Sequence, residues 1–261
     1  MAAYLSVCAI YKDEAPYLAE WVEFHRLVGV EQFFLYDNRS SDNHREVLAP
    51  QIEEGVVTIR DWPQHPGQMP AYRHCLEMHR GDSRWIAFID VDEFMFSPTG
   101  DPVAELLTEY EPWPGVAINR PVFGPSGHST KPPGLVIESY VWRTPAGNTL
   151  KSVVDPKRVF ECDTPHTFTY ADGALPVDEN KQPVEGVRTE TVSISRLRVN
   201  HYLTKSEQEW RTKYSRPRAD TGEMRKVTGL GPRTYRGNVY DDAITTYVPT
   251  LHERLERLGR R

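Results

Sequence analysis

The sequence has no hydrophobic run long enough to cross a lipid bilayer. Its longest apolar stretches, 4–10 and 85–89, are much shorter than the roughly 20 residues that a transmembrane helix needs. The chain also does not open with a basic segment followed by an apolar one, so we expect no cleaved signal peptide. These absences argue against an integral membrane segment and against a secreted precursor, and they predict a cytoplasmic protein.

Cysteine is scarce, and Cys8, Cys75 and Cys162 form no CxxC pair. An odd number of scattered cysteines argues against a disulfide framework and against a cysteine-based zinc site, so we expect reduced, mostly buried thiols. The sequence also lacks the GxGxxG, GxxxxGK(S/T) and GxSxG motifs. An NAD-dependent dehydrogenase, a P-loop ATPase and an α/β-hydrolase therefore lose their main support.

The net charge of −6 argues against a general nucleic-acid-binding protein. Positive charge is nevertheless concentrated between 196 and 236, where eleven Lys or Arg stand against four Asp or Glu. The basic residues are Arg196, Arg198, Lys205, Arg211, Lys213, Arg216, Arg218, Arg225, Lys226, Arg233 and Arg236. A local basic segment on an acidic protein suits a small polyanion such as a diphosphate, and the alternative is a solvated, flexible tail.

The first half of the chain alternates short apolar runs with amphipathic stretches. These patterns predict strands at 3–10, 32–36, 56–60 and 85–89, and helices from 16 to 29, around 46–51 and around 69–79. Strand–helix units of this length are typical of βαβ crossovers, so we predict an α/β fold with a mostly parallel sheet flanked by helices.

The second half has a different character. The segment 112–183 is rich in proline and glycine, and its short β-like runs at 135–142 and 152–160 predict irregular strands and loops over one edge of the sheet. A short helix is expected over 207–214, in front of the basic C-terminal stretch. We expect both halves to belong to one domain.

Polar clusters follow three of the predicted strands, at 11–14, 37–42 and 90–94. In parallel sheets, ligands bind at the carboxyl ends of the strands, so the three clusters predict a binding edge. The last cluster contains Asp90 and Asp92, whose carboxylates suit Mn²⁺ or Mg²⁺ with the remaining positions filled by water and substrate phosphate. An acidic turn without a ligand is the alternative, and acidic turns after strands are common.

Several motifs taken together resemble the glycosyltransferases of family 92, which are related to the family 2 enzymes with a GT-A fold. The resemblance runs from about Leu5 to about Tyr214. It rests on IYKDEAPYLAEWVEFHRLVGVEQFFLYDNRSSD, WIAFIDVDEF and HYLTKSEQEW, with further matches at FGPSGH and VVDPKRVF and at a later histidine. The resemblance implies a GT-A-like domain over 1–261, with a nucleotide-sugar half at 1–110, an acceptor half at 111–215 and a basic segment at 216–261. It also implies inverting transfer of a sugar from a nucleotide diphosphate sugar, with UDP and galactose as the expected donor groups, to an acceptor hydroxyl.

The resemblance also assigns roles to individual residues. It implies that Asp90, Asp92 and His201 bind the metal. It implies that the nucleotide and its diphosphate are bound by Tyr11, Lys12, Glu14, Asp37, Arg73, Asp90 and Lys205. Each role has a structural alternative: a core histidine for His201, a turn or helix-capping cluster for Asp37, and an exposed helical side chain for Arg73.

An inverting transfer needs one general base for the acceptor hydroxyl, and the sequence does not identify it cleanly. Asp163 and His166 are the favoured candidates. The remaining candidates are Glu93, Glu138, Asp155, Glu161 and Asp172, with a structural salt bridge preferred for Glu93. Two other classes of function stay open: a non-catalytic nucleotide-sugar or carbohydrate-binding module, and a metal-dependent phosphohydrolase with Asp90 as nucleophile.

Overall fold

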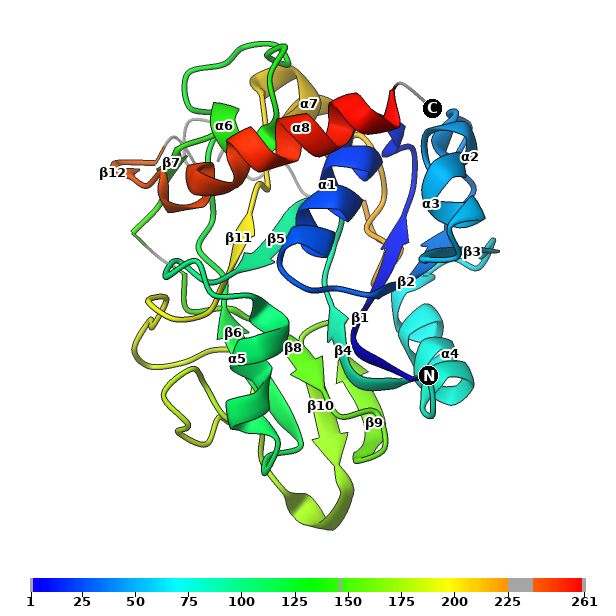
Figure 1. Cartoon of the computed structure of the whole chain (residues 1–261), viewed down its shortest axis with the longest axis vertical. Coiled ribbons are helices and arrows are strands. Elements are labelled where there is room, and N and C mark those ends of the chain that lie inside the picture. The colour runs from blue at the N-terminus through cyan, green and yellow to red at the C-terminus, as the bar shows by residue number, and fades with distance from the viewer. Residues whose placement is uncertain (1, 146, 225–236, 260–261) are drawn as a thin grey trace.

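A computed structural model describes residues 2–145, 147–224 and 237–259 (Figure 1). A six-stranded sheet with the order β3-β2-β1-β4-β8-β6 forms its centre. The strands are β1 (Ala3–Tyr11), β2 (Gln32–Asp37), β3 (Val57–Asp61), β4 (Ser83–Phe88), β6 (Gly115–Asn119) and β8 (Leu150–Val154). Strands β1 to β4 run parallel, and only β8 is antiparallel to both of its neighbours. The predicted α/β class with a mostly parallel sheet is confirmed.

Helices connect the parallel strands. They are α1 (Ala15–Leu27), α2 (His44–Val47), α3 (Ala49–Glu53) and α4 (Gln68–His79). Pro16 in the first turn of α1 suits a helix start because its missing N–H is one of those that have no partner there. Gly29, with φ +102°, lets the chain turn back toward β2 after the helix ends. The predicted helix around 46–51 is replaced by the two short helices α2 and α3.

The two faces of the sheet bury different side chains of β1. Leu5, Val7 and Ala9 belong to the core cluster that includes α1, whereas Cys8 and Ile10 belong to the cluster that includes α4. Successive residues of a strand point to opposite faces, so the continuous apolar run of β1 is explained by burial on both sides. All three cysteines lie in the α4 cluster as free buried thiols, as expected.

The remaining elements are smaller and lie around this sheet. They are β5 (Glu93–Phe96), α5 (Val103–Leu106), η1 (Leu107–Tyr110), α6 (Val136–Ser139), β7 (Trp142–Arg143), β9 (Val159–Thr164), β10 (Thr167–Tyr170), η2 (Ala171–Gly173), β11 (Arg198–His201), α7 (Glu207–Tyr214), β12 (Val239–Tyr240), η4 (Ala243–Tyr247) and α8 (Val248–Leu258). Three antiparallel pairs form, β5 with β11, β9 with β10, and β7 with β12. In Figure 1, α8 lies across α1 on the same face of the sheet. The predicted helix over 207–214 is confirmed as α7.

The predicted strand at 135–142 is wrong over its first part, which forms α6. The N–H groups of Val136 and Ile137 donate to the buried carboxylate of Glu20 in α1, at 3.0 and 3.2 Å, and that of Leu135 donates to Glu138 Oε1 at 2.7 Å. The carboxylates of Glu20 and Glu138 thus accept from the first N–H groups of this helix, which have no partner within the helix itself. The run at 152–160 is divided into β8 and β9 by a turn at Asp155, whose carbonyl accepts from the Arg158 N–H at 3.0 Å.

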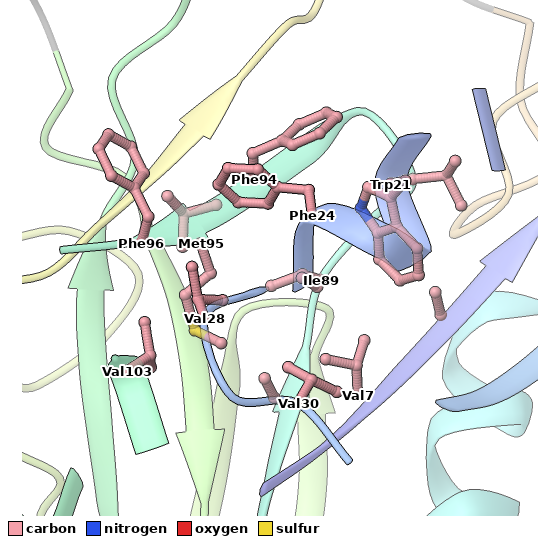
Figure 2. Close-up of a cluster of buried hydrophobic side chains, with 14 of the residues drawn as sticks. Val7, Trp21, Phe24, Val28, Val30, Ile89, Phe94, Met95, Phe96 and Val103 are labelled. Carbon is pink, nitrogen blue, oxygen red and sulfur yellow. The ribbon is translucent and has the colours of Figure 1, made fainter. Parts of the chain in front are cut away.

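Figure 2 shows the core between α1 and the sheet, where Phe24 is fully buried. Its ring centroid lies 5.1 Å from that of Phe94 and 5.4 Å from that of Tyr247, both edge-on. We expect Phe24→Ala to destabilise the protein by about 3–5 kcal/mol, because it leaves a cavity. Thermal unfolding should show a fall of on the order of 10 °C. Phe160, 76% exposed, is the control, and Phe160→Ala should leave the melting temperature unchanged; an equal fall in both variants would contradict this packing.

None of the helices in the described part of the chain is both long enough and apolar enough to cross a membrane. Of the eleven basic residues between 196 and 236, Arg225, Lys226, Arg233 and Arg236 lie outside the described residues.

Candidate functional site

The carboxyl ends of β1, β2 and β4 meet at one edge of the sheet. Tyr11 at the end of β1 is paired in register with Asp37 at the end of β2, and the Ile89 N–H donates to the Cys8 carbonyl one strand away. The loops that follow β1 and β2 each contain a non-glycine residue with positive φ, Asp13 at 52° and Arg39 at 62°. Conformations of this kind cost energy and are concentrated at functional sites.

Hydrogen bonds join the loop after β1 to the loop after β2. Asp13 accepts from the N–H of Ser41 at 2.7 Å, and its own N–H donates to Ser40 Oγ at 2.9 Å. Asp37 Oδ1 accepts from the Ser40 N–H at 2.9 Å, a local bond to the backbone three residues on, with the spacing of a helix-capping bond. The structural alternative for Asp37 is therefore present, and its predicted nucleotide role stays a prediction.

Asp90 lies two residues beyond β4, and both of its carboxylate oxygens have protein partners. Lys151 Nζ donates to Oδ2 at 3.0 Å, and Gln68 Nε2 donates to Oδ1 at 2.8 Å. The hydroxyl of Tyr72 is 3.4 Å from Oδ1. Because the Lys151 side chain is only 1% exposed, this ion pair is little screened by solvent. Asp90 is thus positioned by three groups of the protein itself.

Glu93 opens β5 beside this pair and is fully buried. Lys151 Nζ is 3.2 Å from Glu93 Oε2, Arg120 donates to Oε1, and the Asp90 N–H donates to Oε2 at 2.8 Å. Burial by itself would raise the pKa of Glu93, but Lys151 and Arg120 lower it to about 2. A carboxylate held so firmly in its charged form supports the salt-bridge interpretation over a role as base.

Asp92 and His201 come together through the β5–β11 pair, which sets His201 opposite Glu93. His201 Nε2 is 3.5 Å from Asp92 Oδ2, and Lys213 of α7 donates to the same oxygen. Burial would raise the pKa of Asp92, but Lys213 and His201 hold it well below its usual range. Burial, followed by the charge of Arg120, lowers the pKa of His201, so its ring is neutral at pH 7.

The donor set at this point suits a divalent cation. A carboxylate oxygen and the lone pair of a neutral imidazole converge from Asp92 and His201, and both are ligands that Mn²⁺ accepts. Asp90 pairs with Lys151, and its role as a metal ligand stays a prediction. Within the described ranges no group of three or more His, Cys, Asp or Glu could hold a metal ion together. Two protein ligands would leave the other positions to water and phosphate oxygens.

Lys205 is buried a short distance along the chain, in a conformation with φ +48°. Its ammonium is 3.3 Å from Glu14 Oε2 and 3.2 Å from the centre of the Tyr17 ring. The structure thus joins Lys205 to the predicted Glu14, at the end of β1. Lys12 is exposed, and its carbonyl accepts from Arg216 at 3.3 Å. The Tyr11 hydroxyl is buried with no hydrogen-bond partner among the described residues.

His166 lies at the same edge, in the turn between β9 and β10. Its Nδ1 is 2.8 Å from the carbonyl oxygen of Leu150. Because a carbonyl oxygen can only accept a hydrogen bond, this contact requires the proton of the neutral ring to be on Nδ1. Burial, helped by Lys151 and Arg120, lowers the pKa of His166 to about 4. At pH 7 the ring is therefore neutral, with a lone pair on Nε2. A surface pocket of about 350 Å³ lies beside it.

Asp163 and Arg73 are not brought into this network. Asp163 lies on β9, where it accepts from Thr169 Oγ1 at 2.9 Å, although it lines the same pocket as His166. Arg73 is half-exposed on α4 and pairs with Glu161 at 2.7 Å. The exposed-helix alternative describes Arg73 in this structure, and its contact with a nucleotide stays a prediction.

Sequence reasoning missed the cations that hold the acidic turn. Lys151 and Arg120 were not singled out, and Lys213 was only counted among the eleven basic residues. A signal for Lys151 is present in the sequence, because LKSVV places a lysine inside a short run with Leu150, Val153 and Val154, and the structure buries this strand throughout. A lysine in such a position is almost always paired.

Known proteins with similar sequences point to one family. A model of the family described as "Glycosyltransferase family 92" matches residues 3–228. The glycosyltransferase family 92 protein Os08g0121900 of Oryza sativa subsp. japonica is 26% identical over 94% of this chain and 44% of its own length. Galactan beta-1,4-galactosyltransferase GALS1 of Arabidopsis thaliana is 32% identical over 37% of this chain and 21% of its own length.

Among solved structures, S. aureus TarS 1–349 in complex with UDP is similar, with a TM-score of 0.40 and 10% identity over 59% of this chain and 47% of that one. The chain spans less than half the length of the curated relatives named above. The family match nevertheless covers most of the chain, including the strand ends, the acidic turn and the late histidine. The chain therefore belongs to glycosyltransferase family 92.

Proposed function

We propose that this chain catalyses the metal-dependent, inverting transfer of a sugar from a nucleotide diphosphate sugar to an acceptor hydroxyl. The observation that carries the proposal is the convergence of Asp92 and His201 at the carboxyl edge of a parallel sheet. Ligands of open α/β sheets bind at that edge. Membership of family 92 supports the same reaction.

The donor that we propose is a UDP-sugar, with galactose as the sugar. Galactose is supported by relatives named galactan beta-1,4-galactosyltransferase, which share 26–32% identity with parts of this chain. The choice of UDP as the nucleotide rests on the resemblance to the family. The basic side chains near the edge, Lys205 and Lys213 among them, suit the negative charge of the diphosphate.

Asp92 and His201 would hold the divalent cation, which supplies Lewis-acid stabilisation of the diphosphate leaving group. The protein's own part begins with Lys151, which keeps the turn that carries Asp92 in place through Asp90 and Glu93. The acceptor oxygen forms a bond to the anomeric carbon while the bond to the diphosphate breaks, and the electron pair leaves with the diphosphate. The acceptor proton passes to the base.

His166 is the better of the two predicted bases on this geometry. Its Nε2 carries a lone pair at pH 7, and it lies at the same edge as Asp90 and Lys151, whose charges act on its ring. Asp163 is turned toward Thr169 on the hairpin. A phosphohydrolase with Asp90 as nucleophile is disfavoured because Lys151, Gln68 and Tyr72 already contact both oxygens of that carboxylate.

Thermal unfolding with UDP, GDP, CDP and ADP, each with and without Mn²⁺, tests the proposal. A ligand at 100 times its dissociation constant stabilises a protein by about 2.7 kcal/mol. For a chain of this size we expect a rise of on the order of 5–10 °C with one diphosphate, UDP, and only when Mn²⁺ is present. A flat panel would refute nucleotide-sugar chemistry, whereas binding without transfer to any acceptor would favour the non-catalytic module.

A further inference from the structure

Lys213 occupies the position beside Asp92 and His201 where a cation is most favoured. Its ammonium contacts Asp92 Oδ2 and lies 3.3 Å from the carbonyl oxygen of Leu203. His201 Nε2 lies 3.5 Å from the same carboxylate oxygen. One positively charged group therefore already contacts the carboxylate oxygen that would bind a metal ion together with His201.

The two lysines at the acidic turn differ in their freedom to move. The side chain of Lys151 is 1% exposed and bound by two carboxylates, Asp90 and Glu93. That of Lys213 is 32% exposed and has one carboxylate partner. Lys213 has four methylene groups and access to water, so its ammonium can move away when an arriving cation compensates buried Asp92. Moving Lys151 would instead leave the fully buried Glu93 and the partly exposed Asp90 without its charge.

The backbone that carries Lys213 is fixed. Helix α7 begins with a capping box, in which Ser206 Oγ accepts from the Glu209 N–H at 3.3 Å and Glu209 accepts from the Ser206 N–H at 3.1 Å. Trp210 is buried, and the N–H of Glu207 donates to the carbonyl of His128 at 3.1 Å. The ammonium of Lys213 can therefore move to another partner by rotation of the side chain alone, while the helix stays in place.

We propose that Lys213 is an exchangeable counter-ion: it neutralises Asp92 before the donor binds, gives up this position to the divalent cation, and then pairs with the diphosphate. The inference rests on the proposed metal-dependent function. The charges balance, since Asp92 with a divalent cation carries one net positive charge and the released ammonium adds a second. Together they match the two negative charges of a nucleotide diphosphate sugar.

Lys213→Met tests the exchange because it keeps the length of the side chain and removes only its charge. We expect Mn²⁺ to bind the variant about tenfold more tightly than the wild type when no nucleotide is present, since its competitor is gone. In the presence of Mn²⁺, we expect the variant to bind UDP about tenfold more weakly, because the ammonium no longer reaches the diphosphate. Free Mn²⁺ measured by electron paramagnetic resonance gives the first affinity, and calorimetry gives the second.

Arg211→Met is the matched control, because Arg211 is an exposed cation on the same helix. It should change either affinity by less than about twofold, as a surface charge does. Equal or weaker Mn²⁺ binding by a folded Lys213→Met variant would overturn the exchange while leaving the proposed function intact. If wild-type protein binds no Mn²⁺ even with UDP, both the exchange and the metal-dependent function are refuted.

Discussion

Replacing Asp92 by asparagine should abolish metal-dependent binding of the donor. The change keeps the size of the side chain and removes the charge that Lys213 and His201 face. We expect the affinity for UDP in the presence of Mn²⁺ and the rate of sugar transfer each to fall by at least about a hundredfold, the scale seen when groups around a metal are altered. Calorimetry with and without Mn²⁺ measures the first, and release of the nucleotide measures the second.

The fold should survive this substitution. Lys213 is partly exposed, so its ammonium can move into water when Asp92 is neutralised. His201 is neutral, so it does not need the charge of Asp92 to balance it. Asp82→Asn serves as control, because Asp82 is an exposed aspartate that pairs with His79 and precedes β4, at the opposite end of that strand from the acidic turn. The affinity of the Asp82→Asn variant for UDP should equal that of the wild type. Undiminished Mn²⁺-dependent binding of UDP by Asp92→Asn would remove Asp92 from the metal site.

Replacing Lys151 by methionine should cause a large loss of stability. Methionine fits the buried volume, but Asp90 and Glu93 then lose the ammonium that lies 3.0 and 3.2 Å from their oxygens. Removing one partner of a buried ion pair costs about 3–5 kcal/mol. We expect a fall in melting temperature of on the order of 10 °C in calorimetric scans. Lys157→Met, at an exposed position of the same segment, should have little effect, and a similar fall in both would contradict the role of Lys151.

A second substitution separates the stranded charge from lost packing. Adding Asp90→Asn to Lys151→Met removes the carboxylate that has lost its cation, since Glu93 still accepts from Arg120, so the double variant should be more stable than Lys151→Met alone. Lowering the pH should also reduce the destabilisation caused by Lys151→Met, because acid protonates the carboxylates that have lost the lysine. In the wild type, the depressed pKa of Glu93 contributes stability that is present above its usual value of 4.5 and is lost as the pH falls toward 2. The difference in stability between wild type and Lys151→Met should therefore narrow in acid.

Much of the sheet and its helices can be predicted from local pattern. The apolar runs at 3–10, 32–36, 56–60 and 85–89 mark β1 to β4 to within a few residues, because the apolar side chains of each strand pack into the core. The polar residues after them mark the edge at which Asp37 and Asp90 lie. Helix α7 was also predicted, and the structure shows that it begins with a capping box formed by Ser206 and Glu209.

Predictions failed where distant residues supply the backbone's partners. The segment 135–142 has the composition of a strand, but its N–H groups donate to Glu20, which is 116 residues away from Val136. β5 and β11 were not predicted because each is only four residues long and exists by pairing with the other. No local propensity encodes a partner at such a separation.

The sequence by itself determined the α/β class, the positions of the four parallel strands and the residues at their ends, because these depend on the periodicity of neighbouring side chains. Only the tertiary structure decided which lysine pairs with each of the carboxylates at the strand ends. Asp90 is held by Lys151, 61 residues away, and Asp92 by Lys213, 121 residues away. Which carboxylate remains available to a metal ion thus depends on the order of the strands and on the burial of each lysine, and both arise only when the chain is folded.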